Sequence, residues 1–335
     1  MTNKMVQTLP IADLHCDLLT YLCRGAPCTP YDPVVRCSIP QLRQGGVRLQ
    51  TMAIFTLTEP GSSQQGLSQA QLFKTLPKAY PDDFFFVRES DDVKHLLETN
   101  KIAICLAVEN SSSFAEEDDD LETALALLLR FHKNMGRLLY VSLTWNDENR
   151  FGGGAHTSIG LKQDGRRLLD FLSQHRIAVD LSHASDRLAY DIFEHIEKQR
   201  LPLKVIASHS VMRQIHEVPR NLPDPIAQEI IRRGGVIGLN WIAKFIGPRM
   251  DYFLKHLDRL LLMGGAEHVC FGADFFYEDD VPAAHRTAGT FFFPDFGDAS
   301  RYPRLLQMIR QELHLPEEVL SRLAYGNFLN FVQKN

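Results

Sequence analysis

Short, almost continuously apolar runs alternate along the chain with longer segments whose apolar residues recur at helical spacing. Nearly continuous apolar character is typical of parallel strands that helices cover on both faces, since neither face of such a sheet meets water. Eight runs predict strands on this criterion. They span residues 11–15, 48–55, 102–108, 138–144, 178–182, 205–208, 236–240 and 269–272.

The segments between these runs have the spacing and the end signals of helices. Leu188, Ile192 and Ile196 recur every four residues, and Ser185 ahead of them is a suitable N-cap. Asp224 and the proline after it predict a cap followed by the first residue of another helix. The glycine pair at 234 and 235 predicts where that helix ends.

Alternation of eight strands with helices predicts an α/β fold, a (β/α)8 TIM-type barrel. A doubly wound open sheet is the alternative, but it should offer a glycine-rich phosphate turn after the first strand, where this chain has His15-Cys16-Asp17. We expect residues 1–335 to form a single barrel domain, with C-terminal helices from about residue 302. The longest gap between strands, residues 56–101, should hold an insertion or a long helix rather than another domain.

Composition and charge narrow the classes of partner. The 335 residues include 36 Lys and Arg against 41 Asp and Glu, a net charge of -5 with no polybasic block, so nucleic acid is not an expected partner. No apolar run approaches the roughly 20 residues that cross a bilayer, and the first residues lack the apolar core of a signal peptide. We therefore expect a cytoplasmic protein without a membrane partner. The six cysteines form no Cys-x-x-Cys pair and predict reduced thiols.

Polar side chains follow seven of the eight predicted strands. Catalytic groups of a barrel come from the C-terminal ends of its strands, so these positions are the candidates for chemistry. They are His15 with Asp17, Glu109, Thr144-Trp145-Asn146, His183, His209, Asn240 and Asp274.

Five of these residues have the chemistry of metal ligands. His15 and Asp17 point to one side of an extended segment, because side chains alternate along it. Glu109 follows a buried strand, where a carboxylate is costly unless it is paired or binds a metal. With His183 and His209 they suit two divalent ions of the zinc type, which would acidify a shared water. Taken singly, each residue could be a water-facing carboxylate or a hydrogen-bonded core histidine, and only their convergence favours ligands.

The remaining candidates would handle substrate. Asp274 could move a proton between the water and a leaving amine, or could simply cap a helix. Arg220 and Asn221 lie in a proline-flanked loop, where a guanidinium could hold a substrate carboxylate or face solvent. His156 follows three glycines that predict a flexible active-site loop. Trp145 could line a pocket or pack in the core, and the sequence leaves both open.

Seven sequence pieces, in their order and spacing, resemble the membrane dipeptidase family, also called renal-type dipeptidases, of binuclear zinc peptidases. The resemblance covers nearly the whole chain and indicates a bacterial-type member without a signal or anchor. The pieces are Asp13-Leu-His-Cys-Asp-Leu, Ala107-Val-Glu-Asn, Leu143-Thr-Trp-Asn, Asp180-Leu-Ser-His-Ala-Ser, Ser208-His-Ser with Pro219-Arg-Asn-Leu-Pro-Asp, Gly272-Ala-Asp-Phe, and Tyr325-Gly-Asn.

The resemblance implies a role for each matched residue. His15 and Asp17 would bind a first zinc, Glu109 would bridge, and His183 and His209 would complete a second site. Arg220 would hold the substrate carboxylate, with Asp274 beside the metals. It also implies hydrolysis of dipeptides, often with tolerance for a D-residue on the C-terminal side, and frequent homodimerisation.

Two positions depart from the family pattern. Trp145 stands where the family has a histidine that helps to hold the substrate carbonyl, and His156 could reach the same space. The strand-eight aspartate is followed in the family by Phe-Asp-Gly, but here by Phe275-Phe276-Tyr277, which predicts a more aromatic pocket.

The leading interpretation is a cytoplasmic, metal-dependent dipeptidase that attacks a small dipeptide with a hydroxide bridging two metal ions, most simply Zn²⁺. One alternative keeps the metals but hydrolyses another small amide, a lactone or an N-acyl amino acid, since Trp145 alters the substrate contacts. An alternative of another class is a catalytically inactive metal-binding barrel. The retention of all five ligand candidates argues against that last hypothesis.

Overall fold

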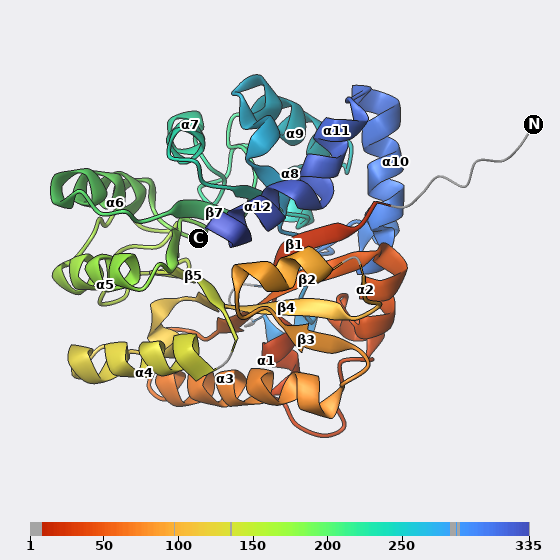
Figure 1. Cartoon of the computed structure of the whole chain (residues 1–335). Helices are drawn as coiled ribbons and strands as arrows, with labels where there is room; N and C mark the ends of the chain where they lie inside the picture. The colour runs from red at the N-terminus through yellow and green to blue at the C-terminus, as the bar shows by residue number, and fades with distance from the viewer. Residues whose placement is uncertain (1–8, 97, 135, 282–285, 287–288, 335) are drawn as a thin grey trace, which may run out of the picture.

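Eight parallel strands close into a ring in the part of the chain that the structure describes (Figure 1). This computed structural model describes residues 9–96, 98–134, 136–281, 286 and 289–334. The ring runs β2-β1-β9-β8-β7-β6-β5-β4, and pairing of β2 with β4 closes it. The strands are β1 (Ile11–Cys16), β2 (Val47–Phe55), β4 (Ile102–Glu109), β5 (Leu138–Ser142), β6 (Ala178–Asp180), β7 (Val205–Ser210), β8 (Ile237–Leu239) and β9 (Val269–Phe271).

The predicted (β/α)8 barrel is therefore confirmed, and all eight predicted strands form. One strand was not predicted: β3 (Phe84–Phe86) pairs with the first residues of β4, outside the ring. Three residues are too few to show a period in the sequence. The long gap that contains β3 also holds the expected long helix, α3 (Ser62–Ala79).

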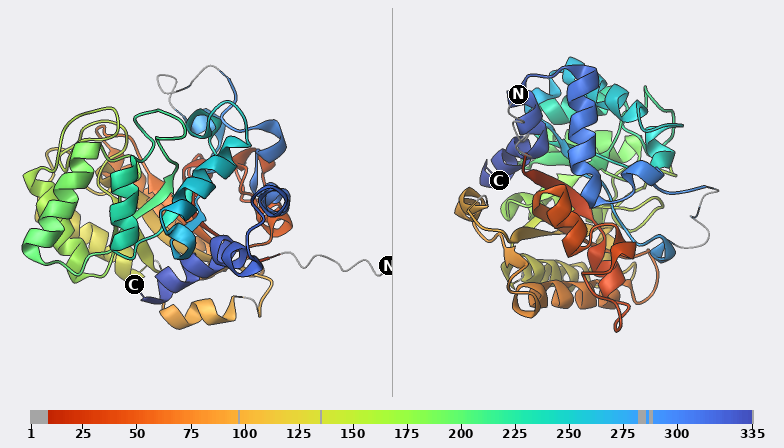
Figure 2. Two further views of the ribbon diagram at one scale, coloured as in Figure 1. Left: turned by 90° about the horizontal axis from the view of Figure 1, so that it is seen from above. Right: turned by 90° about the vertical axis from the view of Figure 1, so that its right-hand side faces the viewer.

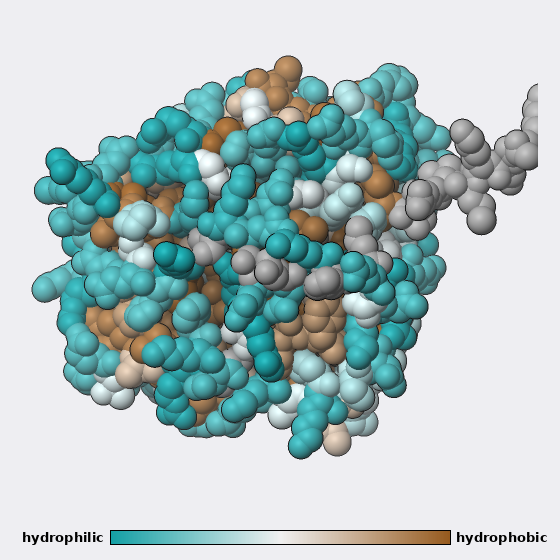
Figure 3. All heavy atoms as spheres, viewed as in Figure 1, coloured by the Kyte–Doolittle hydropathy of each residue, from teal (hydrophilic) through white to brown (hydrophobic). Residues whose placement is uncertain are grey.

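Helices surround the strands on their outer side (Figure 2). Hydrophilic side chains cover most of the molecular face shown in Figure 3, as expected for the outward faces of such helices. Besides α3 they are α1 (Leu18–Leu22), α2 (Ile39–Gly45), α4 (Leu121–Asn134), α5 (Gln163–Gln174), α6 (Asp186–Gln199), α7 (Asp224–Arg232), α8 (Ala243–Ile246), α9 (Tyr252–Leu262), α10 (Tyr302–Leu313), α11 (Glu317–Ser321) and α12 (Asn327–Lys334).

Two helix starts test the predicted caps. The Ser185 hydroxyl accepts from the backbone N–H of Leu188 at 3.0 Å, so this predicted cap is confirmed. Asp224 was predicted as a cap but is the first helical residue, and Pro223 takes the cap position. The reason is tertiary: the Asp224 carboxylate forms an ion pair with Arg259 of α9.

The C-terminal helix α12 closes the barrel end that lies opposite the C-terminal ends of the strands. Its Phe328 and Phe331 pack with Ala12 and Ala103, near the starts of β1 and β4, in one buried cluster. Asn327 at its first position donates to the carbonyl oxygens of Ala266 at 3.0 Å and Val269 at 2.8 Å. One end of the barrel is thus filled with apolar side chains, which leaves the other end for polar ones.

His256 on α9 ties the segment after β7 to α8. Its Nδ1 accepts from the backbone N–H of Met212 at 3.0 Å, and its Nε2 donates to the carbonyl oxygen of Ile246 at 2.9 Å. The ring is fully buried and neutral, since burial lowers the pKa of His256 to about 4. The cysteines are unpaired, as expected. None of the described helices is both long enough and apolar enough to cross a bilayer.

Protonation of His256 should make the fold less stable in acid. Between pH 6.5 and 4 the unfolded chain binds this proton and the native protein does not, so the contribution of His256 is complete above pH 6.5 and is lost as the pH falls. The loss amounts to about 3 kcal/mol by pH 4. Urea unfolding at pH 7 and pH 5 should therefore show a smaller decrease for His256→Gln than for the wild type. Equal decreases in the two proteins would contradict this role.

Candidate metal centre

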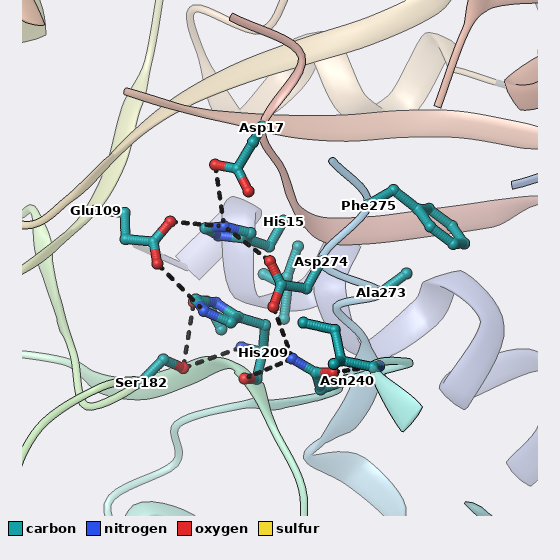
Figure 4. A network of polar contacts seen from close by, with 12 residues as sticks. His15, Asp17, Glu109, Ser182, His209, Asn240, Ala273, Asp274 and Phe275 are labelled. Carbon is teal, nitrogen blue, oxygen red and sulfur yellow. Dashed lines mark hydrogen bonds and ion pairs between the residues drawn. The ribbon is translucent and has the colours of Figure 1, made fainter. Parts of the chain in front are cut away.

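Six ionisable side chains from the ends of five strands meet at the C-terminal end of the barrel, and all six are buried. Figure 4 shows five of them pointing toward one another. They are His15 in β1, Asp17 just after it, Glu109 at the end of β4, His183 after β6, His209 in β7 and Asp274 after β9.

Among the described residues, three sets of three ligand atoms lie within 4.8 Å of one another. The sets are His15, Asp17 and Glu109; Glu109, His183 and His209; and His15, His209 and Asp274. The structure thus brings together all five residues predicted to bind metal, and Asp274 with them. Glu109 belongs to the first two sets, which is the placement that a bridging carboxylate needs.

The contact between His183 and Glu109 tests whether a cation fits this cluster. Nδ1 of His183 lies 2.8 Å from Oδ1 of Asn146, an amide oxygen that can only accept, so Nδ1 has the ring proton. Nε2 of His183 keeps a lone pair, yet it lies 2.8 Å from Oε1 of Glu109 and 2.9 Å from Nε2 of His209. Lone pairs this close repel one another unless a cation lies among them. The three atoms are therefore placed as the ligands of a metal ion would be.

His15 faces the cluster in the same way. Tyr140 donates its hydroxyl proton to the carbonyl oxygen of Leu14 at 2.8 Å, so its oxygen accepts from Nδ1 of His15, also at 2.8 Å. Nε2 of His15 then points toward Oε2 of Glu109 at 3.1 Å and Oδ1 of Asp17 at 3.7 Å. Nε2 of His15 and Oδ1 of Asp17 are buried without a directed hydrogen bond to any described residue, as two ligand atoms would be.

The charges in the cluster shift the pKa values of its members in opposite directions. Burial raises the pKa of Glu109, but His15 and His183 outweigh burial and hold it well below its ordinary value. Burial, followed by the charge of Arg220, lowers the pKa of His183 to about 3. Glu109 is thus ionised and His183 neutral at neutral pH, the states that metal ligation requires.

Two members of the cluster hold a proton more readily than usual. Burial lowers the pKa of His15, but Tyr140 and Glu109 outweigh burial and raise it well above its ordinary value. Burial and then repulsion from Glu109 raise the pKa of Asp17 to about 6. A cation that binds between these side chains therefore displaces a proton.

His183 and Asp274 have left-handed backbone conformations, with φ of 70° and 63°. Such values are uncommon outside glycine and cost on the order of 1 kcal/mol or more each. Both residues stand just beyond a strand end, where the chain turns away from the barrel. The hydrophobic pattern could not predict this strain, which places the two side chains over the barrel mouth.

A cavity of about 360 Å³ adjoins the cluster, which suits a small molecule rather than a polypeptide. Glu109, His183 and Asp274 form one part of its wall. Another part of its lining, the aromatic wall, consists of five aromatic side chains: Phe55, Trp145, Phe245, Phe276 and Phe291. The aromatic pocket predicted from the residues after Asp274 therefore includes Phe276.

Arg220 is a buried cation in this cavity. Its Nη1 donates to the Ser210 hydroxyl at 3.0 Å and its Nη2 to the carbonyl oxygen of His209 at 2.9 Å, while its Nε has no hydrogen bond among the described residues. No described carboxylate forms an ion pair with it, and the side chain lies over the ring of Phe245. A buried charge without a counter-ion is costly, so this arginine is suited to an anionic ligand.

The other predicted substrate residues divide into two groups. Trp145 and His156 line the cavity. The indole ring of Trp145 lies between Phe55, at 5.2 Å, and His183, at 5.8 Å between ring centroids. Asn221 does not line the cavity: it is buried and donates to the carbonyl oxygens of His216 and Phe245.

The glycines before His156 serve close packing. A Cβ atom on Gly154 would lie 2.0 Å from the carbonyl oxygen of Trp145, and one on Gly153 would lie 2.3 Å from the Thr157 hydroxyl. The segment is buried, and the His156 N–H donates to the carbonyl oxygen of Asn146 at 2.8 Å. The expectation of a flexible loop therefore gives way to a backbone held against its neighbours.

Two residues that orient the histidines were not predicted. Tyr140 lies inside an apolar strand, and nothing in the sequence marks its contact with His15. Asn146 stands at a strand end and was noted only as a polar residue, although it anchors His183. Tyr140 contacts His15 from β5, which is not adjacent to β1 in the ring, whereas Asn146 and His183 follow the adjacent strands β5 and β6. Both contacts join residues that are distant in the sequence.

Comparison with known proteins agrees with this geometry. The model of the membrane dipeptidase family (peptidase family M19) matches residues 1–334. A protein of Schizosaccharomyces pombe described as an uncharacterized dipeptidase is 28% identical over 281 residues, which cover 80% of this chain but only 62% of that protein. A Klebsiella pneumoniae protein described as encoded in the pqqA 5' region is 27% identical over 259 residues, 72% of this chain and 85% of its own length.

Solved structures share the fold over nearly the full length. A structure described as the dipeptidase AC, a metallopeptidase of family M19, has a TM-score of 0.80 at 21% identity and covers 98% of both chains. A metallopeptidase from Rhodobacter sphaeroides, solved with a phosphinate mimic of L-Ala-D-Ala, has a TM-score of 0.81 at 21% identity over 97% of this chain and 99% of its own.

Substitution of Glu109 by glutamine should remove the shared anionic ligand. Without its charge the two ligand sets lose their common member, so we expect the metal content after dialysis against zinc to fall by at least about one ion per chain. Plasma mass spectrometry of the purified protein measures this. Glu194→Gln, at an exposed position on α6, is the matched control and should leave the content unchanged. Full metal content in Glu109→Gln would remove the bridging role.

Proposed function

The chain belongs to the membrane dipeptidase family, peptidase family M19, and from this premise we propose that it hydrolyses the amide bond of small dipeptides with two divalent metal ions. One observation supports this most directly: a cluster of ligands that shares Glu109 and an arginine without a counter-ion open into the same cavity. A dipeptide has a scissile carbonyl for the first and a free carboxylate for the second.

The ligand chemistry favours zinc. Three imidazole nitrogens and carboxylate oxygens are donors that Zn²⁺ accepts, in two sets that meet at Glu109. His15 and Asp17 would hold one ion with Glu109, and His183 and His209 the other. When bound, such a pair of ions acidifies a shared water and polarises the scissile carbonyl.

Asp274 would transfer the proton. Its Oδ2 accepts from the side-chain amide of Asn240 at 2.9 Å, which orients the carboxyl group, and its Oδ1 lies 3.7 Å from Nε2 of His15. Burial raises the pKa of Asp274 well above its ordinary value, which favours its protonated form. As a carboxylate it would take a proton from the attacking water, and it would then give that proton to the leaving amine.

Arg220 would bind the free carboxylate of the substrate. The guanidinium has N–H groups to spare after its contacts with Ser210 and His209, and burial strengthens its attraction for an anion. The phosphinate mimic of L-Ala-D-Ala in the Rhodobacter sphaeroides relative supports dipeptides of small residues as substrates, with a D-residue on the C-terminal side. Homodimerisation and a cytoplasmic location stay predictions.

A second candidate substrate follows from the aromatic wall. Trp145 packs on His183 where the family has a histidine, so one polar contact to the substrate is replaced by an apolar surface. An N-acyl amino acid offers a carboxylate for Arg220 and an apolar acyl group for Phe55, Trp145 and Phe276. The same metal ligands would serve either amide.

A substrate panel tests the proposed function. Zinc-loaded protein should hydrolyse L-Ala-D-Ala or L-Ala-L-Ala, and C-terminal amidation should lower kcat/KM by about 10- to 150-fold, the equivalent of one lost charge-assisted contact. In Arg220→Gln, kcat/KM for the free dipeptide should fall by about the same factor, whereas kcat/KM for the amidated dipeptide should change little. Arg187→Gln, at an exposed position on α6, is the control.

The panel also separates the alternatives. Turnover of N-acetyl amino acids without turnover of dipeptides would favour the second candidate. Bound metal without turnover of any amide would favour an inactive metal-binding barrel. Equal turnover of free and amidated dipeptides by the wild type would contradict the role of Arg220.

His156 should supply the carbonyl contact that Trp145 does not make. His156→Ala should therefore lower kcat by about 10- to 100-fold, the size of a lost hydrogen-bond donor to a developing oxyanion. Trp145→His in that background should restore part of the loss. Steady-state kinetics with one dipeptide measures both effects, and unchanged turnover in His156→Ala would exclude the role.

A further inference from the structure

Asp180, at the end of β6, is buried beneath the metal centre and belongs to none of the three ligand sets. Its Oδ1 accepts from the backbone N–H groups of Ser182 at 3.1 Å and Ser208 at 2.7 Å. Its Oδ2 accepts from the hydroxyls of Ser142 and Ser208, both at 2.7 Å. Burial raises the pKa of Asp180, while these four donors favour its ionised form.

These contacts determine where the ring proton of His209 lies. The Ser208 hydroxyl has one hydrogen, and it donates that hydrogen to Asp180. Oγ of Ser208 also lies 2.8 Å from Nδ1 of His209, so in this contact it can only accept. Nδ1 of His209 therefore has the proton, and Nε2 presents its lone pair to Nε2 of His183 at 2.9 Å.

We infer that Asp180 is a positioning residue that, through Ser208, holds His209 in the tautomer that can bind a metal ion. His15 and His183 obtain the same tautomer from a single neighbour each, Tyr140 and Asn146. His209 alone among the three depends on a chain of two side chains, in which a buried charge orients a hydroxyl. The inference rests on the proposed role of His209 as a ligand.

The substitution Asp180→Asn should reverse the direction of these hydrogen bonds, because it keeps the shape of the side chain but replaces an acceptor by a donor. Two backbone N–H groups meet Oδ1 and cannot accept, so the amide oxygen must stay there and the NH₂ group must replace Oδ2. The Ser208 hydroxyl would then accept from Asn and turn its hydrogen toward Nδ1 of His209. The ring proton would move to Nε2, which could no longer bind the metal. Among the other acceptors near Ser208, Oγ of Ser182 is farther away, at 3.4 Å.

The experiment compares three variants by zinc affinity and zinc content. Asp180→Asn should weaken binding at the His209 site by about 10- to 100-fold, the usual effect of losing an orienting partner. Ser208→Ala should weaken it less, because Nδ1 loses an acceptor but meets no opposing donor. The double variant Asp180→Asn/Ser208→Ala should bind zinc more tightly than Asp180→Asn, since it removes the misdirected hydroxyl. Imidazole ¹⁵N chemical shifts of the metal-free proteins should show that Nε2 of His209 is protonated in Asp180→Asn only.

Asp13 on β1 is the matched control. It is equally buried, and it accepts from the backbone N–H groups of His15 at 2.8 Å and Ala273 at 3.0 Å, but its carboxylate forms no hydrogen bond or ion pair with an imidazole ring among the described residues. Asp13→Asn should therefore destabilise the fold. It should cause no loss of zinc affinity that the addition of Ser208→Ala reverses.

The outcomes separate this inference from the proposed function. Zinc binding no tighter in the double variant than in Asp180→Asn, or unchanged affinity in Asp180→Asn, overturns the inference alone. His209→Ala is measured beside them: if that variant keeps the full zinc content, the ligand assignment fails and takes the inference with it. Loss of one ion in His209→Ala, together with the rescue, supports both.

Discussion

More hydrogen-bond acceptors meet at the mouth of this barrel than there are protons to separate them. The neutral Nε2 of His183 lies 2.8 Å from an ionised Glu109 oxygen and 2.9 Å from another imidazole nitrogen, and all three side chains are buried. Such an arrangement is repulsive by itself, and a cation is what makes it favourable. The rest of the structure can be understood as the framework that keeps these atoms together: a closed ring of strands, an opposite end filled by α12, and buried partners that turn each imidazole the right way.

The lining of the cavity combines groups with different tasks. The ligand cluster and Asp274 supply acidic side chains, whose charges would be balanced by bound ions. Aromatic side chains and the buried Arg220 also line it, and Arg220 forms no ion pair among the described residues. A substrate that fits such a lining has a polarisable carbonyl at one end and an anion at the other. This combination, more than the barrel itself, is what favours a dipeptide, because barrels of this type serve many reactions.

The sequence predicts the barrel, and the side chains that meet at its mouth, for one physical reason. Parallel strands covered on both faces have continuous apolar runs, and the polar residue that ends each run must lie at the barrel mouth. The prediction weakens where direction depends on tertiary contact. Asn221 neighbours Arg220, yet its side chain turns to backbone carbonyls instead of the cavity. Asp224 looks like a cap but pairs with Arg259, and the partners Tyr140 and Asp180 contact residues of other strands that are distant in the sequence. The local sequence around these residues does not indicate these long-range contacts.

The central claim is that two cations share Glu109 between His15 with Asp17 and His183 with His209. Anomalous diffraction from zinc-loaded crystals, measured on both sides of the zinc absorption edge, tests this most directly. The account predicts two zinc peaks, each within about 2.0–2.2 Å of its nitrogen and oxygen ligands, with one Glu109 oxygen toward each. A single peak, or peaks at which Glu109 contacts only one ion or neither, would contradict it.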